Sequence, residues 1–173
     1  MKLYVIRHAP REPSDDFTDA EEGDPEAEIT DEGKLIASAI GERMAQDGDV
    51  PSVIYASPTV RTQQTAELIA EAIGEAGFAA PEVKVDVSIG PYMSIRGLVL
   101  KLAADGSKSA AIVSHQQSIR AGLQALNVDN DEPGKPDPHA AGEVRALKVK
   151  RKSGKWSEQS RMRPSDLGFS DVY

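Results

Sequence analysis

Lys2-Leu3-Tyr4-Val5-Ile6 is an apolar run near the start of the chain, and Arg7-His8-Ala9 follows it directly. A short run rich in apolar and β-branched residues is typical of a buried strand, so we expect a strand over residues 2–6. Arg7 and His8 then lie at the carboxyl end of that strand, where ligands bind in open α/β sheets. This segment therefore predicts both a first strand and an edge of a sheet at which chemistry can occur.

Strand-like and helix-like segments alternate along the rest of the chain. We expect further strands at 53–56, 83–87 and 110–114, then a hairpin of 144–149 and 155–159 that turns at Ser153-Gly154. We expect helices that begin with Thr30 as N-cap, with Pro58 in the first position, near Leu98, and at Ile119. Their apolar stripes include Leu35 and Leu100. This alternation predicts an α/β fold with a mostly parallel central sheet flanked by helices and a C-terminal hairpin strand.

Length and composition set the limits of the fold. A chain of 173 residues with 39% hydrophobic residues suits one globular domain over 1–173. Residues 10–28, rich in acidic residues and proline, predict a solvated loop, and residues 162–173 a loose tail. The absence of cysteine excludes disulfides and thiolate catalysis. The formal charge of −8 disfavours nucleic acid and anionic membranes as partners, and we expect a cytoplasmic protein.

Basic and histidine side chains follow several predicted strands at the same edge of the sheet. Arg7 and His8 follow the first strand, and His115 follows the fourth. Arg61 lies in the first turn of the helix after the second strand, whereas Arg96 is expected to be an exposed helix residue. Guanidinium groups match phosphate oxygens bidentately, and a neutral histidine can act as a covalent nucleophile. The cluster therefore indicates a phosphate pocket suited to phosphoryl transfer.

Four blocks of sequence carry a family resemblance: Val5–Ala9, Ile29–Gly33, Ser57–Ala66 and Ile112–His115. In order and spacing they resemble the histidine phosphatase superfamily, also called the phosphoglycerate mutase-like family. The length and layout are similar to its small cap-less branch, to which the phosphohistidine phosphatase SixA belongs. The resemblance implies a phosphoglycerate mutase-like fold and a phosphatase that uses neither a metal nor an organic cofactor.

The resemblance also implies roles for residues of the pocket. His8 would be the nucleophile that becomes phosphohistidine, Arg7 and Arg61 would bind the phosphate, and His115 would hydrogen-bond its oxygens. The backbone N–H of Gln116 would point at the same group. Two positions depart from the family pattern, because Ala9 stands where glycine is usual and Gln117 where proline is usual.

The proton donor is the weak point of the resemblance. Many members of the family carry Glu or Asp after the third strand, but residues 88–96 contain neither, which leaves Asp86, Glu12 and Asp15 as candidates. Protonation of an alkoxide leaving group contributes about 10²–10⁴-fold in rate, and an imidazole leaving group needs less help. The short loop after the third strand also leaves no room for a large cap. The missing acid favours protein phosphohistidine as the substrate, and the short loop favours an open site and a protein-borne or bulky phosphoester.

Other interpretations stay open at this point. A small phosphomonoester such as a sugar or nucleotide phosphate is the alternative substrate, and a non-catalytic module that binds phospho-ligands is the alternative function. A metal site made of His8 and His115 is disfavoured, because no carboxylate pattern accompanies them and arginines would repel the cation. We expect Gln64 to tie its helix to a loop, and His139 to have no role.

Overall fold

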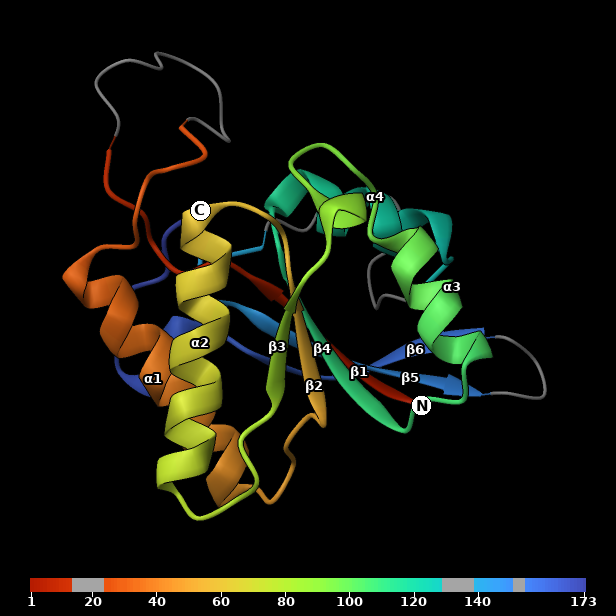
Figure 1. Ribbon diagram of the computed structural model, residues 1–173, viewed down its shortest axis with the longest axis horizontal. Coiled ribbons are helices and arrows are strands. Elements are labelled where there is room, and N and C mark those ends of the chain that lie inside the picture. Colours follow the sequence, from red (N-terminus) through yellow and green to blue (C-terminus); the bar gives the residue numbers. More distant parts are fainter. Residues whose placement is uncertain (14–23, 129–138, 151–154) are drawn as a thin grey trace.

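A computed structural model describes residues 1–13, 24–128, 139–150 and 155–173, and Figure 1 shows their arrangement. In these residues one sheet has the order β3-β2-β4-β1-β5-β6. Its strands are β1 (Lys2–Arg7), β2 (Val53–Ala56), β3 (Glu82–Val85), β4 (Ser109–Ser114), β5 (Val144–Lys150) and β6 (Lys155–Met162). The first four run parallel, whereas β5 is antiparallel to β1 and β6 to β5. The predicted α/β fold with a mostly parallel sheet and a C-terminal hairpin is confirmed.

Helices cover both faces of the sheet (Figure 1). One face carries α1 (Asp31–Gln46) and α2 (Val60–Glu75), and the other carries α3 (Arg96–Ala104) and α4 (Gln116–Ala125). Two short 3₁₀ helices, η1 (Val87–Ile89) and η2 (Pro164–Leu167), complete the described elements. No helix in the described ranges has the length and apolar character that a membrane span requires.

The first strand contributes to a hydrophobic core on each face. Tyr4 and Ile6 belong to the cluster that includes α1 and α2, while Leu3 and Val5 belong to the cluster that includes α3 and α4. Successive side chains of a strand point to opposite faces, so a strand covered on both sides needs a continuous apolar run. This requirement explains the unbroken Leu3–Ile6 run in the sequence.

The two helices on the first face begin differently from one another. Thr30 caps α1 as predicted, because its Oγ1 accepts a hydrogen bond of 2.9 Å from the Gly33 amide. Helix α2 does not begin at Pro58, so that prediction is wrong. Thr59 is extended (φ −83°, ψ 149°) and is the N-cap, and the Val60 amide donates to the Pro25 carbonyl at 3.0 Å. The chain reaches helical geometry two residues later than predicted, and a neighbouring loop binds the first amide of the helix.

Several predicted boundaries and apolar positions also differ from the structure. Strand β3 ends at Val85 instead of at Val87, because the side chain of Asp86 caps η1 directly after the strand. Val87 belongs to η1 and is 75% exposed. Helix α4 begins three residues before the predicted position of Ile119. Leu35 and Leu100, expected in buried stripes, are 61% and 40% exposed. These residues continue an apolar pattern into positions that turn away from the sheet.

The segments around the helices are tied to the fold by a few contacts. Gln64 Oε1 accepts a hydrogen bond of 2.9 Å from the Ile29 amide, as the sequence predicted. The tail at 162–173, expected to be loose, contains η2, and the Ala141 amide donates to the Val172 carbonyl at 2.6 Å. The predicted turn at Ser153-Gly154 lies outside the described residues.

Close approach of α1 and α2 depends on Gly41. A Cβ atom at this position would lie 2.5 Å from the Ile69 carbonyl oxygen and 2.8 Å from Ala72 Cβ. We expect Gly41→Ala to lower the free energy of unfolding by about 1–3 kcal/mol in urea titrations, because overpacking outweighs the gain in helix propensity. Gly97→Ala in α3 is the matched control: its Cβ would meet nothing within 4 Å. The control should raise stability by at most about 1 kcal/mol, and equal effects of the two changes would contradict the assignment.

Candidate active site

The register of the parallel strands brings the two histidines of the predicted pocket together. Arg7 in β1 pairs with Ser114 in β4, so His8 and His115 leave adjacent strands at the same level. The His8 amide donates to the Ser114 carbonyl at 3.0 Å. The centroids of the two imidazole rings are 5.4 Å apart, with an angle of 62° between the ring planes. Ligands of open α/β sheets bind at this edge.

His8 is buried and neutral. Its Nδ1 lies 2.8 Å from the Ala9 carbonyl oxygen, which can only accept, so Nδ1 carries the proton and Nε2 carries a lone pair. Burial lowers the pKa of His8 well below its ordinary value. The positive charges of Arg61 and Arg7 lower that pKa further, while the bond to Ala9 acts in the opposite direction. An unprotonated imidazole nitrogen is what nucleophilic catalysis by histidine needs.

Hydrogen bonds fix the orientation of the His115 ring. Its Nδ1 lies 3.3 Å from Arg61 Nη2, and because a guanidinium only donates, Nδ1 accepts. The opposite nitrogen, Nε2, therefore donates to Ser57 Oγ at 2.9 Å. All three side chains are buried. In the sequence, Ser57 is the first residue of a motif block and has no assigned role in the pocket, so its contact with His115 is a feature that the sequence did not reveal.

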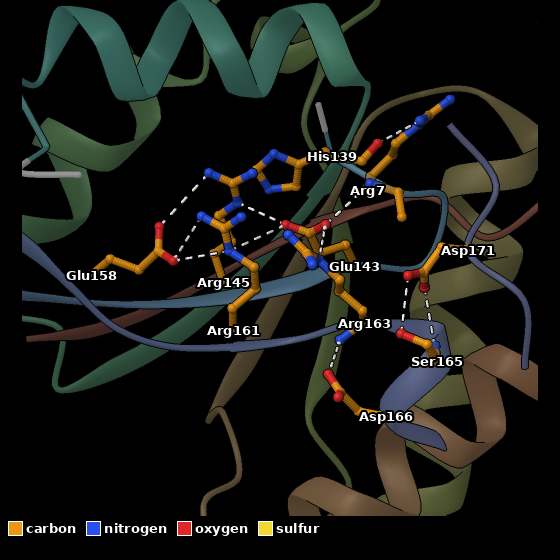
Figure 2. Close-up of polar contacts among 11 residues, drawn as sticks. Arg7, His139, Glu143, Arg145, Glu158, Arg161, Arg163, Ser165, Asp166 and Asp171 are labelled. Carbon is orange, nitrogen blue, oxygen red and sulfur yellow. Dashed lines mark hydrogen bonds and ion pairs between the residues drawn. The ribbon is translucent and has the colours of Figure 1, made fainter. Parts of the chain in front are cut away.

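Each arginine of the pocket is fixed by a backbone carbonyl. Arg61, in the first turn of α2, donates from Nη1 to the Asp24 carbonyl at 2.9 Å. Arg7 donates from Nη1 to the His139 carbonyl at 2.5 Å (Figure 2). His139, for which the sequence suggested no role, is buried and lies beside the pocket. Burial, followed by the charges of Arg145 and three further arginines, lowers its pKa well below the ordinary value.

Two helices begin beside the pocket. Gln116, the half-buried first residue of α4, follows His115 directly, and Arg61 is the second residue of α2. The first amides of a helix have no partner within the helix, and the helix dipole favours anions at this end. The Gln116 amide belongs to this group, and its contact with a phosphate stays a prediction.

Two of the candidate proton donors, Asp86 and Glu12, do not join the cluster. Asp86 Oδ1 accepts from the amide and the hydroxyl of Ser88 at 2.8 and 2.6 Å, and so caps η1. The Glu12 side chain is exposed, and its backbone amide donates to the Glu28 carbonyl. Neither carboxylate has a hydrogen bond or ion pair with His8 in the described ranges. Asp15 lies outside them.

Metal-ligating side chains are also scarce near the pocket. In residues 1–13, 24–128, 139–150 and 155–173, no three histidine or carboxylate side chains are grouped closely enough to hold a metal ion. What the structure brings together is two neutral imidazoles, two guanidinium groups and two helix N-termini. Such a set presents positive charge and hydrogen-bond donors to an anion, and a lone pair to an electrophilic centre.

Solved phosphatase structures share the fold. A protein histidine phosphatase SixA complexed with tungstate superposes with a TM-score of 0.75 at 18% identity, over 96% of this chain and 99% of that one. A putative phosphohistidine phosphatase SixA from Agrobacterium tumefaciens gives a TM-score of 0.71 at 19% identity, over 94% and 98%. Phosphoserine phosphatase from Entamoeba histolytica, in complex with 3-phosphoglyceric acid, gives 0.68 at 17% identity, over 96% and 98%. At these identities the likeness concerns the fold, which is phosphoglycerate mutase-like as predicted.

Sequence similarity agrees with the fold. Residues 3–86, which contain three of the four motif blocks, match the model of the histidine phosphatase superfamily (branch 1). Over these residues, just under half of the chain, the sequence is similar to that superfamily. No curated protein matches the chain.

Two of the three buried histidines, His8 and His139, should make stability depend on pH. His8 and His139 both have pKa values below the ordinary 6.5 in the folded state. The unfolded chain binds protons at these residues below about pH 6.5 and the folded chain does not, so acid favours unfolding. We expect the free energy of unfolding to fall between about pH 6.5 and 5.5, by up to about 1.4 kcal/mol per pH unit for each histidine.

Urea titrations at several pH values measure this dependence. The variant His8→Asn lacks one of the two titrating groups, so it should show a clearly shallower slope than the parent protein. A parent protein whose stability is constant across this range would contradict the assignment of two buried neutral histidines.

Proposed function

We propose that the chain is a phosphatase in which Nε2 of His8 attacks phosphorus and forms a phosphohistidine intermediate. The observation that carries this proposal is the hydrogen bond from His8 Nδ1 to the Ala9 carbonyl. It leaves Nε2 with its lone pair in a buried pocket beside Arg61 and His115. Burial and the neighbouring charges keep the ring unprotonated at neutral pH.

The reaction has two steps in this proposal. In the first, the bond between His8 Nε2 and phosphorus forms while the bond from phosphorus to the leaving group breaks. In the second, water attacks phosphorus, the Nε2–P bond breaks, and inorganic phosphate leaves with His8 regenerated. Arg7, Arg61, His115 and the Gln116 amide bind the phosphoryl oxygens and stabilise the charge that spreads over them in each transition state. No metal or organic cofactor takes part.

We further propose protein phosphohistidine as the substrate class. The leaving group of a phosphohistidine is an imidazole, which needs less help from an acid than an alkoxide does. Asp86 is occupied in capping η1, and Glu12 is exposed, which supports a substrate of this kind. Only ten residues, 86–95, separate β3 from α3, and this short connection leaves the edge of the sheet open to a protein-borne group.

A small phosphomonoester remains the second candidate substrate. The observation that favours it is the shared fold with a phosphoserine phosphatase that was solved with a small phosphate ester bound. The leaving group separates the two substrate classes. A binding module without turnover is the third possibility, and it differs from both in forming no intermediate.

The nucleophile is tested by replacing His8. We expect His8→Ala to abolish turnover of p-nitrophenyl phosphate, because no other described side chain presents an unprotonated nucleophilic nitrogen at this place. The parent protein, quenched in denaturant during turnover, should carry one base-stable and acid-labile phosphoryl group on His8, detected by mass spectrometry. Turnover by the variant at the parental rate contradicts the assignment. Phosphate binding by a parent protein without any turnover favours the binding module.

Leaving-group dependence tests the substrate class. We expect kcat/KM for a phosphohistidine peptide to exceed that for a phosphoserine peptide of the same sequence by about 10²–10⁴-fold, because Glu12 and Asp86, the candidate acids among the described residues, lie outside the cluster and do not assist the alkoxide. Glu12→Gln and Asp86→Asn are the matched variants. Each should change turnover of the phosphoserine peptide by less than about twofold, whereas a general acid contributes at least about 10²-fold. A loss of that size in either variant identifies the acid and favours phosphomonoesters.

A further inference from the structure

An ionic network around the buried Glu143 lies next to Arg7 and His139 (Figure 2). We call it the Glu143 network, and its members are Glu143, Arg145, Glu158, Arg161 and Arg163. They come from β5, from β6 and from residues that immediately adjoin these strands. The network thus lies on the antiparallel side of the sheet, next to β1, and its carboxylate at Glu143 is completely buried.

The carboxylate of Glu143 uses both oxygens. Oε1 accepts from Arg145 Nε at 2.9 Å and lies 3.6 Å from Arg161 Nε. Oε2 accepts from the Ala140 amide at 3.1 Å and lies 3.6 Å from Arg163 Nε. Burial of a carboxylate is costly unless charge and hydrogen bonds compensate it, and here both compensate it. One oxygen therefore faces the arginines of the hairpin, and the other holds a backbone amide of the preceding turn.

That turn, residues 139–143, forms backbone hydrogen bonds with Arg7 and His8. The Glu143 amide donates to the Ala140 carbonyl at 2.9 Å, and the Arg7 amide donates to the Glu143 carbonyl at 3.1 Å. The Gly142 amide is shared between the carbonyls of Arg7 and His8, at 3.1 and 3.0 Å. Gly142 has a φ of +84°, and a Cβ atom there would lie 2.7 Å from Ile36 Cγ2. Any other residue at this position would strain the backbone and crowd Ile36.

The same turn presents the carbonyl that orients Arg7. His139, the residue that accepts from Arg7 Nη1 at 2.5 Å, is joined directly to Ala140, whose amide is held by Glu143 Oε2. A guanidinium is planar, so a fixed hydrogen bond at one nitrogen sets the direction of the whole fork. The orientation of Arg7 thus depends on a carbonyl whose place depends on the Glu143 carboxylate.

We propose that Glu143 is a positioning residue for phosphate binding: through the turn at 139–143 it holds the His139 carbonyl, and thereby the guanidinium of Arg7, in the orientation that binds a phosphoryl group. This inference rests on the proposed function, since it assumes that Arg7 binds the phosphate. It goes beyond that function by assigning a role to a residue that does not touch the substrate. Glu143 belongs to none of the four motif blocks, and its role follows from its contacts alone.

Glu158 supplies a matched control for this role. It is a second carboxylate of the same network, and its Oε1 accepts from Arg161 Nε at 3.0 Å and pairs with Arg161 Nη2. Its Oε2 lies 3.7 Å from Arg145 Nη1. Glu158 lies on β6, and it has no hydrogen bond to the turn at 139–143 in the described residues. Glu158→Gln removes a negative charge from Arg145 and Arg161, two of the three arginines that Glu143 faces, but it leaves the support of the His139 carbonyl intact.

The experiment compares orthovanadate affinities of purified full-length variants by calorimetry, together with kcat and KM for p-nitrophenyl phosphate. We expect Glu143→Gln to weaken vanadate binding at least about tenfold, the amount that corresponds to one misplaced charge-assisted hydrogen bond. KM should rise by a similar factor. Glu158→Gln should stay within about twofold of the parent protein. Unfolding midpoints, measured for both variants, ensure that binding is compared between folded proteins.

A third arm asks whether Glu143 acts through Arg7. In the Arg7→Ala background, Glu143→Gln should change vanadate affinity by less than about twofold, because the group that it positions is absent. An effect of Glu143→Gln that persists at full size in this background overturns the inference, as do equal affinities of Glu143→Gln and the parent. Either result leaves the proposed function intact. A parent protein that neither turns over p-nitrophenyl phosphate nor binds vanadate refutes both.

Discussion

The parallel pairing of β1 with β4 is the constraint on which the rest of the structure depends. Because Arg7 is paired with Ser114, the residues that follow them leave the sheet at one level, and the His8 amide donates to the Ser114 carbonyl. A shift of this register by one residue would turn the apolar side chains of β1 to the wrong faces. Packing of the hydrophobic core therefore fixes the positions of both histidines, and the geometry of the pocket depends on side chains that lie far from it.

At that edge of the sheet, a strongly acidic chain brings several arginine side chains close together. The formal charge is −8, yet Arg61 is completely buried and Arg7 lies beside a network with three further arginines. Among the described residues, Arg61 and Arg7 donate to the carbonyls of Asp24 and His139, and the arginines of the hairpin pair with Glu143. Carbonyl partners fix the geometry of a guanidinium and leave its charge in place.

The sequence predicted the fold because the relevant forces are local or periodic. The apolar run at Leu3–Ile6 and the N-cap at Thr30 each have a physical signature within a few residues. The structure brings together the four side chains that the motifs indicated, Arg7, His8, Arg61 and His115. What sequence reasoning missed is long-range: the Ser57 hydroxyl on His115, and the His139 carbonyl on Arg7. A backbone carbonyl has no signature in the sequence, and neither does a partner that is 132 residues distant.

The acidic segment near the N-terminus is closed at its base by backbone contacts. The Glu12 amide donates to the Glu28 carbonyl, and Arg11 forms an antiparallel bridge with Ile29. The entropic cost of a closed loop grows only slowly with its length. Evolution could therefore lengthen or shorten the chain between these residues at little cost to stability. Asp24 is the exception, because its carbonyl oxygen accepts a hydrogen bond from Arg61. Selection would therefore preserve the position of this carbonyl group while the neighbouring side chains diverge.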